Sequence, residues 1–596
     1  MEHFTVRFLP DQRRVAVPRG TTLIEAADRA GILLYSACGR VGTCGQCRVQ
    51  VAGQGDVLAC QYRVERDVQV TVPDGSRYYT QQILRHTHGE GTAAEPSLIK
   101  VFLPGVEVGP DACVDRIGRI LGRPVRSCPP AQELSVVDTG VLGSGSGITA
   151  VCRESLSAEP AEPLWLIGVE PGDTRTELYG LAVDLGTTTI VGRLHDLQSG
   201  HVLATVAEAN PQIRYGDDVV SRIHHAGEPA GREALQSAVT GCLDDLLGRA
   251  ASEAGVSCQH VYEVLVAGNT TMGHLLVGLP VASLGQAPYH AHTLELQDRA
   301  AASLGIKAAP GARVVVLPNI AGFVGADTTA VALAVGLDDL DENTLVVDIG
   351  TNGELLLKAG GRMLAASCAA GPALEGARIG QGSRAVDGAI QSVEVIDGRV
   401  EVDVIGGVAA RTICGSGLID AVAVMLETGV LDASGRFLED DELPESMSQD
   451  IRFRRVVHNG QPAFVIAEDP ANVAGRVLLT QRDIREVQLA KGAIRTGAEL
   501  LLGEAGLKVA DLHAVLLAGA FGNYIRRASA LRIGLLPPVA EERIGFVGNA
   551  ALAGASMCLV NRSCRRRAVE LARRIKYVEI AHRPDFQMAF AESMLF

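Results

Sequence analysis

The sequence predicts a multidomain α/β protein, on three observations. The chain has 596 residues, and at about 150 residues per domain this allows roughly four domains. From Tyr179 to Phe596, apolar strand-like runs that end in Gly/Thr-rich turns alternate with amphipathic helical segments, as in α/β folds. One strand and turn also recurs, because Val183-Asp-Leu-Gly-Thr-Thr188 returns 164 residues later as Val347-Asp-Ile-Gly-Thr-Asn352. This spacing is too long for a solenoid repeat and predicts two copies of one α/β subdomain.

Residues 1–76 are predicted to form a small unit of their own. Phe4–Phe8 alternates as a strand does, and Arg14–Val17 follows it after a Pro-Asp turn, so the two segments are expected to pair. Thr22 is placed to cap a short helix over Leu23–Ala30.

Three further segments follow this unit. Residues 77–97 have no steady period and are interpreted as a linker. Residues 98–176 are predicted to form a modest α/β unit that opens with a strand over Leu98–Leu103. Residues 177–596 contain the repeated segment and form the main α/β region.

Composition excludes several classes of protein. Apolar residues make up 47% of the chain, which argues against disorder as the main state. The net charge of −15 (54 Lys and Arg against 69 Asp and Glu) argues against broad binding to nucleic acid phosphates. No uninterrupted apolar run has the roughly 18 residues that a membrane helix needs, and the N-terminus lacks the pattern of a signal peptide. A cytoplasmic protein that binds neither nucleic acid nor membrane is therefore expected.

Four of the 13 cysteines are grouped near the N-terminus. Cys38, Cys44, Cys47 and Cys60 are separated by five, two and twelve residues, with glycines between the first three. A glycine-rich loop allows thiolates to converge on a [2Fe–2S] cluster and leaves backbone amides free to donate to sulfur. Zinc is the alternative, but its sites usually take two Cys-x2-Cys pairs and this segment has one. We interpret the four cysteines as cluster ligands.

The repeated turns are candidates for a nucleotide site. Asp184 and Asp348 each end a strand and precede Gly-Thr, so their carboxylates can hold Mg²⁺ through water while the following amides bind phosphates. One such turn alone is equally consistent with an ordinary hairpin, whereas two copies favour a site. Leu517-Ala-Gly-Ala-Phe-Gly522 is a strand that enters a glycine-rich turn and could contact adenosine. Cys414-Gly-Ser-Gly417 opens a helix, where glycine more often serves packing.

Together these segments resemble the phosphate 1, phosphate 2, adenosine and connecting motifs of the actin, sugar kinase and Hsp70 ATPase superfamily. Members of that superfamily have no Walker lysine, and this chain has no G-x4-G-K-[ST] segment. The resemblance implies a duplicated actin-like (ribonuclease H-like) ATPase domain.

The whole chain resembles the reductive activators of corrinoid proteins. The stretches that carry this resemblance, beside the cysteines and the repeated turns, are Asn210–Asp217, Ala267–His274, Leu317–Gly322, Gln481–Arg485 and Gln488–Lys491. It implies a β-grasp [2Fe–2S] ferredoxin domain (1–76), a linker (77–97), a small α/β middle domain that helps to form a homodimer (98–176) and the ATPase domain (177–596).

The same resemblance implies the activity. Activators of this kind use ATP to reduce the inactive Co(II) corrinoid of a methyl-transferring corrinoid protein to Co(I), with one electron from the [2Fe–2S] cluster. Their partners are that corrinoid protein and a low-potential donor of the ferredoxin or flavodoxin type.

Site residues are assigned as hypotheses from these motifs. Asp184 and Asp348 would organise Mg²⁺, and Glu354 is a candidate base that orients water. Ser367 is a candidate for approach to the corrinoid, against the alternative of an internal turn beside the nucleotide. The residues expected to bind ATP are Gly186, Thr187, Thr188, Thr189, Gly350, Thr351, Asn352, Gly353, Gly415, Ser416, Gly519, Ala520, Phe521 and Gly522.

Three other functions remain open at this level. An activator of 2-hydroxyacyl dehydratases also drives electrons with an ATPase of this superfamily, but it has no N-terminal ferredoxin. A small-molecule kinase with a fused redox sensor would phosphorylate an acceptor and need no strong reductant. A non-catalytic module would use ATP only to switch docking.

Overall fold

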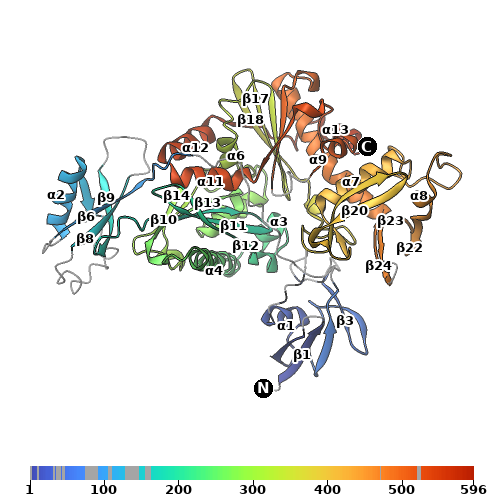
Figure 1. Cartoon of the computed structure of the whole chain (residues 1–596), viewed down its shortest axis with the longest axis horizontal. Helices are drawn as coiled ribbons and strands as arrows, with labels where there is room; N and C mark the ends of the chain where they lie inside the picture. The colour runs from blue at the N-terminus through green and yellow to red at the C-terminus, as the bar shows by residue number, and fades with distance from the viewer. Residues whose placement is uncertain are drawn as a thin grey trace.

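The computed structural model describes residues 3–9, 12–30, 32, 34, 40, 42, 47–73, 92–104, 110–127, 147–154, 163–469, 472–519 and 525–596. In Figure 1 the N-terminal sheet (blue) lies at the bottom, and a second small sheet lies at the left of the two larger sheets. Each of the predicted segments therefore contains its own sheet. The predicted domain boundaries remain a prediction.

The N-terminal sheet has the order β2-β1-β5-β3-β4 and one helix, α1 (Leu23–Arg29). The predicted pairing of the first two strands is confirmed, since Phe4 lies opposite Val17; the Pro-Asp turn between them is outside the described residues. Thr22 caps α1 as predicted, in a capping box with Glu25. The strands are β1 (His3–Leu9), β2 (Arg13–Pro18), β3 (Arg48–Val51), β4 (Gly55–Leu58) and β5 (Val68–Thr71).

The second small sheet has the order β6-β8-β9-β7 and carries helix α2 (Pro110–Leu121). Its first strand, β6 (Leu98–Leu103), is the one predicted at the start of this unit. The other strands are β7 (Val125–Ser127), β8 (Ile148–Arg153) and β9 (Leu164–Pro171). The core of this unit is small and aliphatic, with Leu103 and Ile117 fully buried.

The remaining chain forms two lobes, each built on a six-stranded sheet. The first lobe has the order β12-β11-β10-β13-β15-β14. Its strands are β10 (Tyr179–Leu185), β11 (Thr189–Asp196), β12 (Val202–Ala209), β13 (Val261–Gly268), β14 (Gln297–Ala300) and β15 (Arg313–Val316). Its helices are α3 (Val219–His225), α4 (Pro229–Ala254), α5 (Thr270–Leu276) and α6 (Ala326–Ala334).

The sheet of the second lobe has the order β26-β25-β16-β17-β18-β27. Its strands are β16 (Thr344–Ile349), β17 (Gly353–Ala359), β18 (Arg362–Cys368), β25 (Ala514–Ala518), β26 (Ile544–Gly548) and β27 (Lys576–Tyr577). The helices of the C-terminal half are α7 (Gly415–Glu427), α8 (Gln449–Phe453), α9 (Gln481–Ala505), α10 (Arg527–Arg532), α11 (Ala550–Val560), α12 (Arg562–Arg574) and α13 (Phe586–Ser593).

The two lobes share one topology, so the predicted duplication is confirmed. In the first lobe, β10, β11 and β12 form an antiparallel meander, and β13 and β15 extend the sheet from β10 in parallel. In the second lobe, β16, β17 and β18 form the same meander, and β25 and β26 extend it from β16 in the same way. β10 and β16 are therefore equivalent central strands, and the turn after each of them occupies the equivalent place.

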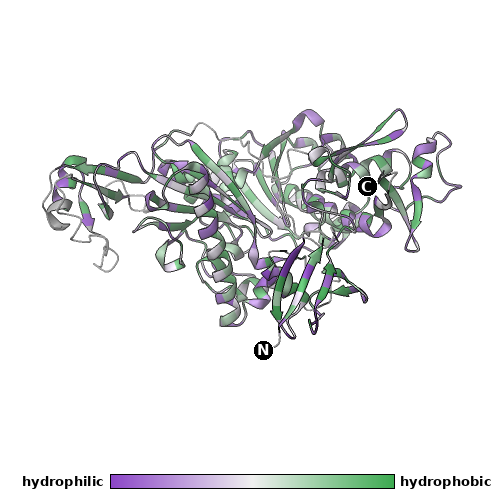
Figure 2. Cartoon of the chain, turned by 60° about the horizontal axis from the view of Figure 1, so that its bottom comes forward, coloured by the Kyte–Doolittle hydropathy of each residue, from purple (hydrophilic) through white to green (hydrophobic). Residues whose placement is uncertain are grey.

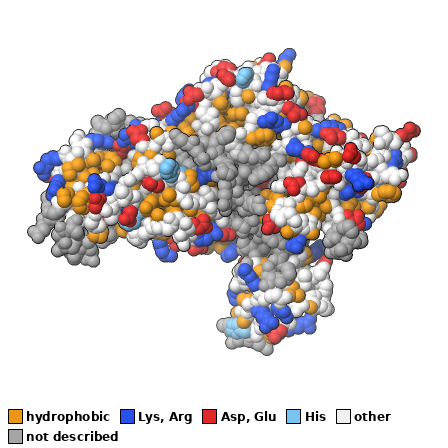
Figure 3. Space-filling model, viewed as in Figure 1, with side chains coloured by type: hydrophobic (Ala, Val, Ile, Leu, Met, Phe, Trp, Pro, Cys, Tyr) orange, Lys and Arg blue, Asp and Glu red, His pale blue; other side chains and the backbone are white. Residues whose placement is uncertain are grey.

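Two smaller three-stranded sheets are inserted in the second lobe. One has the order β20-β19-β21, from β19 (Ala389–Ile396), β20 (Arg399–Val404) and β21 (Thr412–Ile413). The other has the order β22-β23-β24, from β22 (Arg455–His458), β23 (Gln461–Asp469) and β24 (Asn472–Thr480). Hydrophobic residues colour the strands of the large sheets green in Figure 2, whereas acidic and basic side chains are interspersed over the face seen in Figure 3.

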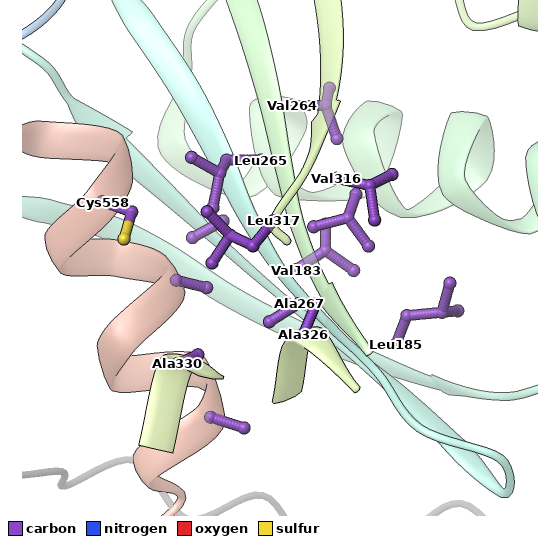
Figure 4. Packing of buried hydrophobic residues seen from close by; sticks show 14 of the residues in the cluster. Val183, Leu185, Val264, Leu265, Ala267, Val316, Leu317, Ala326, Ala330 and Cys558 are labelled. Carbon is purple, nitrogen blue, oxygen red and sulfur yellow. The ribbon is translucent and has the colours of Figure 1, made fainter. Parts of the chain in front are cut away.

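Helices α11 and α12 belong to the first lobe although their neighbours in sequence belong to the second. The chain leaves the second sheet at the end of β26, packs α11 against α6 and β10, and returns at β27. Figure 4 shows Cys558 of this helix facing the aliphatic core of the first lobe. A Cβ at Gly554 would lie 2.0 Å from the carbonyl oxygen of Ala330, so glycine is needed for this close approach of α11 to α6.

A buried ion pair fixes α12 to the first sheet. Arg565 donates to the carboxylate of Glu263 on β13, and the side chains are 6% and 1% exposed. Arg153 of the second small sheet lies 3.5 Å from the same carboxylate. The carboxylate of Glu263 thus joins β13, α12 and the second small sheet, which are distant from one another in sequence.

Glu263→Gln should destabilise the first lobe by about 3–5 kcal/mol, because it removes the charge that two buried arginines face. Native-state hydrogen exchange of the β13 amides measures this loss directly. Glu295→Gln is the matched control, since the Glu295–Arg573 pair is two-thirds exposed and its loss should cost less than about 1 kcal/mol. Equal effects of the two substitutions would contradict this account.

Candidate functional site

The first of the repeated turns joins β10 to β11 and is held from behind by buried polar side chains. Arg222, which is fully buried, donates to the carbonyl oxygen of Thr187 at 2.6 Å. Asn210 donates to the carbonyl of Gly186 at 2.9 Å, and Asn269 donates to the Thr187 hydroxyl at 3.0 Å. These hydrogen bonds hold two carbonyl groups and one hydroxyl of the turn, so the shape of the turn is fixed before a ligand binds.

The second turn joins β16 to β17 and has a different support. The amide of Gly350 donates to the carbonyl of Asn352 at 3.0 Å, which closes the turn on itself. Gly519, at the end of β25, lies against it with φ of +109°. A Cβ at Gly519 would be 2.5 Å from the carbonyl oxygen of Ile349, so only glycine fits there.

The two turns face one cavity. It is lined from the first lobe by the turn after β10, by Asn269 at the start of α5 and by Asp327 in the first turn of α6. From the second lobe it is lined by the turn after β16, by Glu354 and by Glu375. A cavity between two glycine-containing turns at strand ends is a suitable shape for a nucleotide.

Most of the residues predicted to bind ATP line this cavity. They are Asp184, Gly186, Thr187, Thr188, Thr189, Asp348, Gly350, Thr351, Asn352, Glu354 and Gly519. Gly353 is buried against Ile494 of α9 and is not among the lining residues. Ala520, Phe521 and Gly522 lie outside the described residues.

Gly415 and Ser416 lie at the start of α7 and are not among the lining residues. The Ser416 hydroxyl donates to the carbonyl of Gln391 on β19 at 2.8 Å. A Cβ at the next glycine, Gly417, would be 2.3 Å from the carbonyl oxygen of Ile390. The glycines of this segment therefore allow α7 to pack closely on β19.

Four polar lining residues received no role from the sequence, namely Asn269, Asp327, Glu375 and Asn549. Asn269 and Asn549 follow the strands β13 and β26 and cap the helices α5 and α11. Asn549 donates to the carboxylate of Asp184 at 2.8 Å. A polar residue directly after a buried parallel strand was the signal that could have identified both asparagines.

The floor of the cavity concentrates carboxylates. Loss of solvent raises the pKa of Asp184 and of Asp327 to about 6, and of Asp348 to about 7. The neighbouring carboxylates add to this, since Asp327 and Asp184 both raise the pKa of Asp348. Desolvation, with Asp327 and Asp348, also raises the pKa of Glu354 well above its usual value. Such a group of like charges binds a cation or a protonated partner favourably.

Ser367 pairs with Glu354 across β17 and β18 and is half-buried. It is not among the residues that line the cavity. Within the described residues, no group of three or more His, Cys, Asp or Glu is arranged to hold a metal ion by itself. Across the described ranges, no helix is both long and apolar enough to span a bilayer.

Two of the four candidate cluster ligands are described, and their surroundings fit a thiolate-held group. Cys47 and Cys60 are 1% and 6% exposed, and the amide of Ala59 donates to the carbonyl of Cys47 at 2.9 Å, so the two cysteines are close. The side-chain amide of Gln61 is 3.4 Å from the Cys60 sulfur. A hydrogen-bond donor directed at a buried sulfur stabilises the negatively charged thiolate form of that cysteine. Cys38 and Cys44 lie outside the described residues.

Gly186→Ala should lower the affinity for ATP by at least tenfold, because the added Cβ would meet the carbonyl oxygen of Thr189 at 2.5 Å and open the turn. Titration with a fluorescent ATP analogue measures the change. Gly241→Ala on α4 is the control, since a Cβ there meets nothing within 4 Å and alanine favours a helix. Unchanged affinity in Gly186→Ala would show that this turn does not bind the phosphates.

Gln61→Met should lower the reduction potential of the N-terminal domain, because a hydrogen bond to a thiolate favours the more negative, reduced state. A potentiometric titration followed by electron paramagnetic resonance measures the shift. Gln54→Met, at an exposed position of the same sheet region, should leave the potential unchanged. A potential that rises or stays constant in Gln61→Met would contradict the role of this amide.

Three family models match the chain in order. A 2Fe-2S iron-sulfur cluster binding domain matches residues 4–75, the RACo middle region matches 179–340, and the C-terminal domain of RACo, the ASKHA domain, matches 342–596. Fold and site thus define an actin-like ASKHA ATPase joined to a [2Fe–2S] ferredoxin domain, as the sequence predicted. The family's middle region corresponds to the first lobe and begins after the second small sheet.

Known proteins resemble the chain over its full length. A corrinoid activation enzyme, RamQ, of Eubacterium limosum is 31% identical over 591 residues, 98% of each chain. The [Co(II) methylated amine-specific corrinoid protein] reductase of Methanosarcina barkeri is 28% identical over 67% of this chain and 73% of its own. The solved structure of a reductive activator for corrinoid, iron-sulfur protein has a TM-score of 0.75 at 30% identity and covers 100% of this chain and 98% of that one. The chain belongs to the family of reductive activators of corrinoid proteins.

Proposed function

We propose that this protein is an ATP-dependent reductive activase that returns the inactive Co(II) corrinoid of a methyl-transferring corrinoid protein to Co(I). The observation that carries the proposal is the presence, in one chain, of the buried Cys47–Cys60 pair and a two-lobed cavity with a phosphate turn on each side. When bound, the [2Fe–2S] cluster supplies one electron at low potential. The names of the full-length relatives support the same substrate.

The coupling to ATP follows from the energetics of the substrate. Co(I) is a very strong reductant, and for one electron each ~59 mV of unfavourable potential difference is a factor of ten. A ferredoxin of about −400 mV therefore cannot populate Co(I) without help. A ligand shifts an equilibrium only through its different affinity for two states, so the ATP-bound and ADP-bound lobes must bind the corrinoid protein differently.

The turns and carboxylates of the cavity receive roles in this proposal. The amides and hydroxyls of residues 186–189 and 350–352 bind the phosphates of ATP. The absence of a side chain at Gly519 allows the adenosine part of ATP to approach the turn after β16. Asp184 and Asp348 hold Mg²⁺ through water, with Asp327 beside them, because Mg²⁺ usually keeps several waters and shares its other positions between carboxylates and phosphates. A divalent cation offsets the loss of solvent that raises the pKa values of these three carboxyls, and the repulsion that Asp327 adds at Asp184 and Asp348.

Glu354 is proposed as the residue that orients the attacking water. It lines the cavity, and burial beside Asp327 and Asp348 raises the pKa of its carboxyl well above the usual value, which makes the carboxylate a stronger base. Ser367 lies opposite Glu354 on β18 and remains the proposed point of approach to the corrinoid.

The further partners are also proposals. A low-potential ferredoxin or flavodoxin would reload the N-terminal domain, and the second small sheet (98–171) would contribute to a homodimer. This assignment keeps the predicted division at residues 76, 97 and 176, and we propose that the activase acts in the cytoplasm.

Asp348→Asn should reduce ATP turnover at least a hundredfold, because the substitution removes one of the two carboxylates proposed to organise Mg²⁺. Turnover should be measured with and without a corrinoid protein in its Co(II) state, since stimulation by that partner distinguishes an activase from a kinase with a redox sensor. The visible spectrum of the cluster should not change, because Cys47 and Cys60 lie beside the strands of a separate sheet.

Asp341→Asn is the matched control, since Asp341 is exposed and precedes β16. It should retain full turnover and full stimulation. Loss of the cluster spectrum in Asp348→Asn would show that the two domains do not fold independently, and phosphoryl transfer to a small acceptor in place of stimulation by the corrinoid protein would favour the kinase.

A further inference from the structure

Glu375 forms a bridge between the two phosphate turns. The Thr351 hydroxyl donates to its Oε1 at 2.9 Å, and the Thr188 hydroxyl donates to its Oε2 at 3.2 Å. Thr188 belongs to the first lobe and Thr351 to the second. The carboxylate therefore contacts both turns at once, and we call this arrangement the Glu375 bridge.

The hydroxyl protons of Thr188 and Thr351 that are donated to Glu375 are also the protons that a bound phosphate would accept. A threonine hydroxyl has one proton and can donate it to one acceptor at a time. A phosphate oxygen that accepts from Thr188 or Thr351 therefore competes directly with Glu375. The Glu375 carboxylate and a phosphate bound to the same hydroxyls would also repel each other. We therefore expect the phosphate to replace Glu375 at these hydroxyls.

Other charges hold Glu375 in this place. Arg384 lowers the pKa of its carboxyl, which desolvation raises more strongly. The guanidinium of Arg384 lies 3.5 Å from the carbonyl oxygen of Thr188 and so faces the same turn. Asp217 of the first lobe is a further negative group near the carboxylate. Contact between the lobes is thus made by hydrogen bonds from Thr188 to Glu375 and from Arg384 to the Thr188 carbonyl.

The turn that carries Glu375 is firmly connected to the second lobe. It spans residues 371–376, with glycines of positive φ at both ends, and a Cβ at Gly376 would lie 2.2 Å from the carbonyl oxygen of Ser383. Ala373 and Leu374 are buried in the core, where the turn contacts α7 and α9. Any displacement of the Glu375 backbone would therefore move residues that pack on two helices of this lobe.

We propose that Glu375 gives up its two hydroxyl hydrogen bonds to the phosphates of ATP, and that this exchange transmits nucleotide binding to the turn 371–376. The inference rests on the proposed ATPase function of the cavity. It assigns Glu375 as a positioning residue that sets the affinity for ATP and the contact between the lobes. In this role Glu375 competes with the nucleotide for the two hydroxyls. If Glu375 instead bound Mg²⁺ or acted as a base, it would assist ATP binding or turnover.

Calorimetric titration of the full-length protein with Mg²⁺ and a non-hydrolysable ATP analogue tests the competition. Glu375→Gln should bind the analogue about tenfold more tightly than the wild type, because the neutral amide holds the two hydroxyls less strongly and leaves their protons available to the phosphates. Glu401→Gln, at an exposed position of β20, should bind like the wild type. A thermal melt confirms that Glu375→Gln is folded.

A double-mutant cycle separates the bridge from a general effect of charge. In a Thr188→Val, Thr351→Val background, Glu375→Gln should change the affinity less than threefold, because the shared protons are gone. Hydrogen exchange gives a second readout: the analogue should raise exchange in 371–376 of the wild type while it lowers exchange in 186–190.

The outcomes are distinct. Absence of binding to the wild type would overturn both the ATPase function and this inference. Binding by the wild type together with equal or weaker binding by Glu375→Gln would overturn the bridge alone. A tenfold gain that persists in the valine background, or protection of 371–376 by the analogue, would also overturn it.

Discussion

Asp184 and Asp348 end the equivalent central strands of the two lobes, and this places like charges in one recess. Asp327 adds a third carboxylate from α6. Lost solvent raises the pKa values of all three carboxyls, and the charge of Asp327 raises those of Asp184 and Asp348 further. Hydrogen-bond donors surround these carboxylates and the adjacent turn. Asn549 donates to the carboxylate of Asp184, and the buried side chains of Arg222 and Asn210 donate to carbonyl oxygens of the first turn. The recess is suited to a cation that arrives with a polyanionic ligand.

The connection between the lobes follows from the path of the chain. Asn549 stands where the chain passes from β26 to α11, and it contacts Asp184 directly. From there α11 packs on α6, which carries Asp327, and α12 forms the buried contact of Arg565 with Glu263. Arg562, at the start of α12, pairs with Glu95 and Glu154 beside the second small sheet. A continuous set of contacts thus joins the cavity floor to that sheet.

Much of this could be predicted from the sequence because the signals are local. The repeated Asp-x-Gly-Thr turns located both lobes and most lining residues, and the capping box at Thr22 and Glu25 located the first helix. Asp327 and Glu375 could not be assigned, because their roles depend on tertiary contacts between segments far apart in the chain, whereas Asn269 and Asn549 could have been found from their place directly after a strand. Gly415 and Ser416 show the converse, since this helix start was predicted to bind ATP but packs on β19 and is not among the lining residues.

The most direct test of the central claim is anaerobic visible spectroscopy of the reduced protein with a corrinoid protein in its Co(II) state, with and without Mg²⁺ and ATP. The account predicts that the Co(I) spectrum appears only when ATP is present and hydrolysed. Formation of Co(I) at the same rate without ATP, or its absence despite ATP hydrolysis and a reduced iron-sulfur domain, would contradict it.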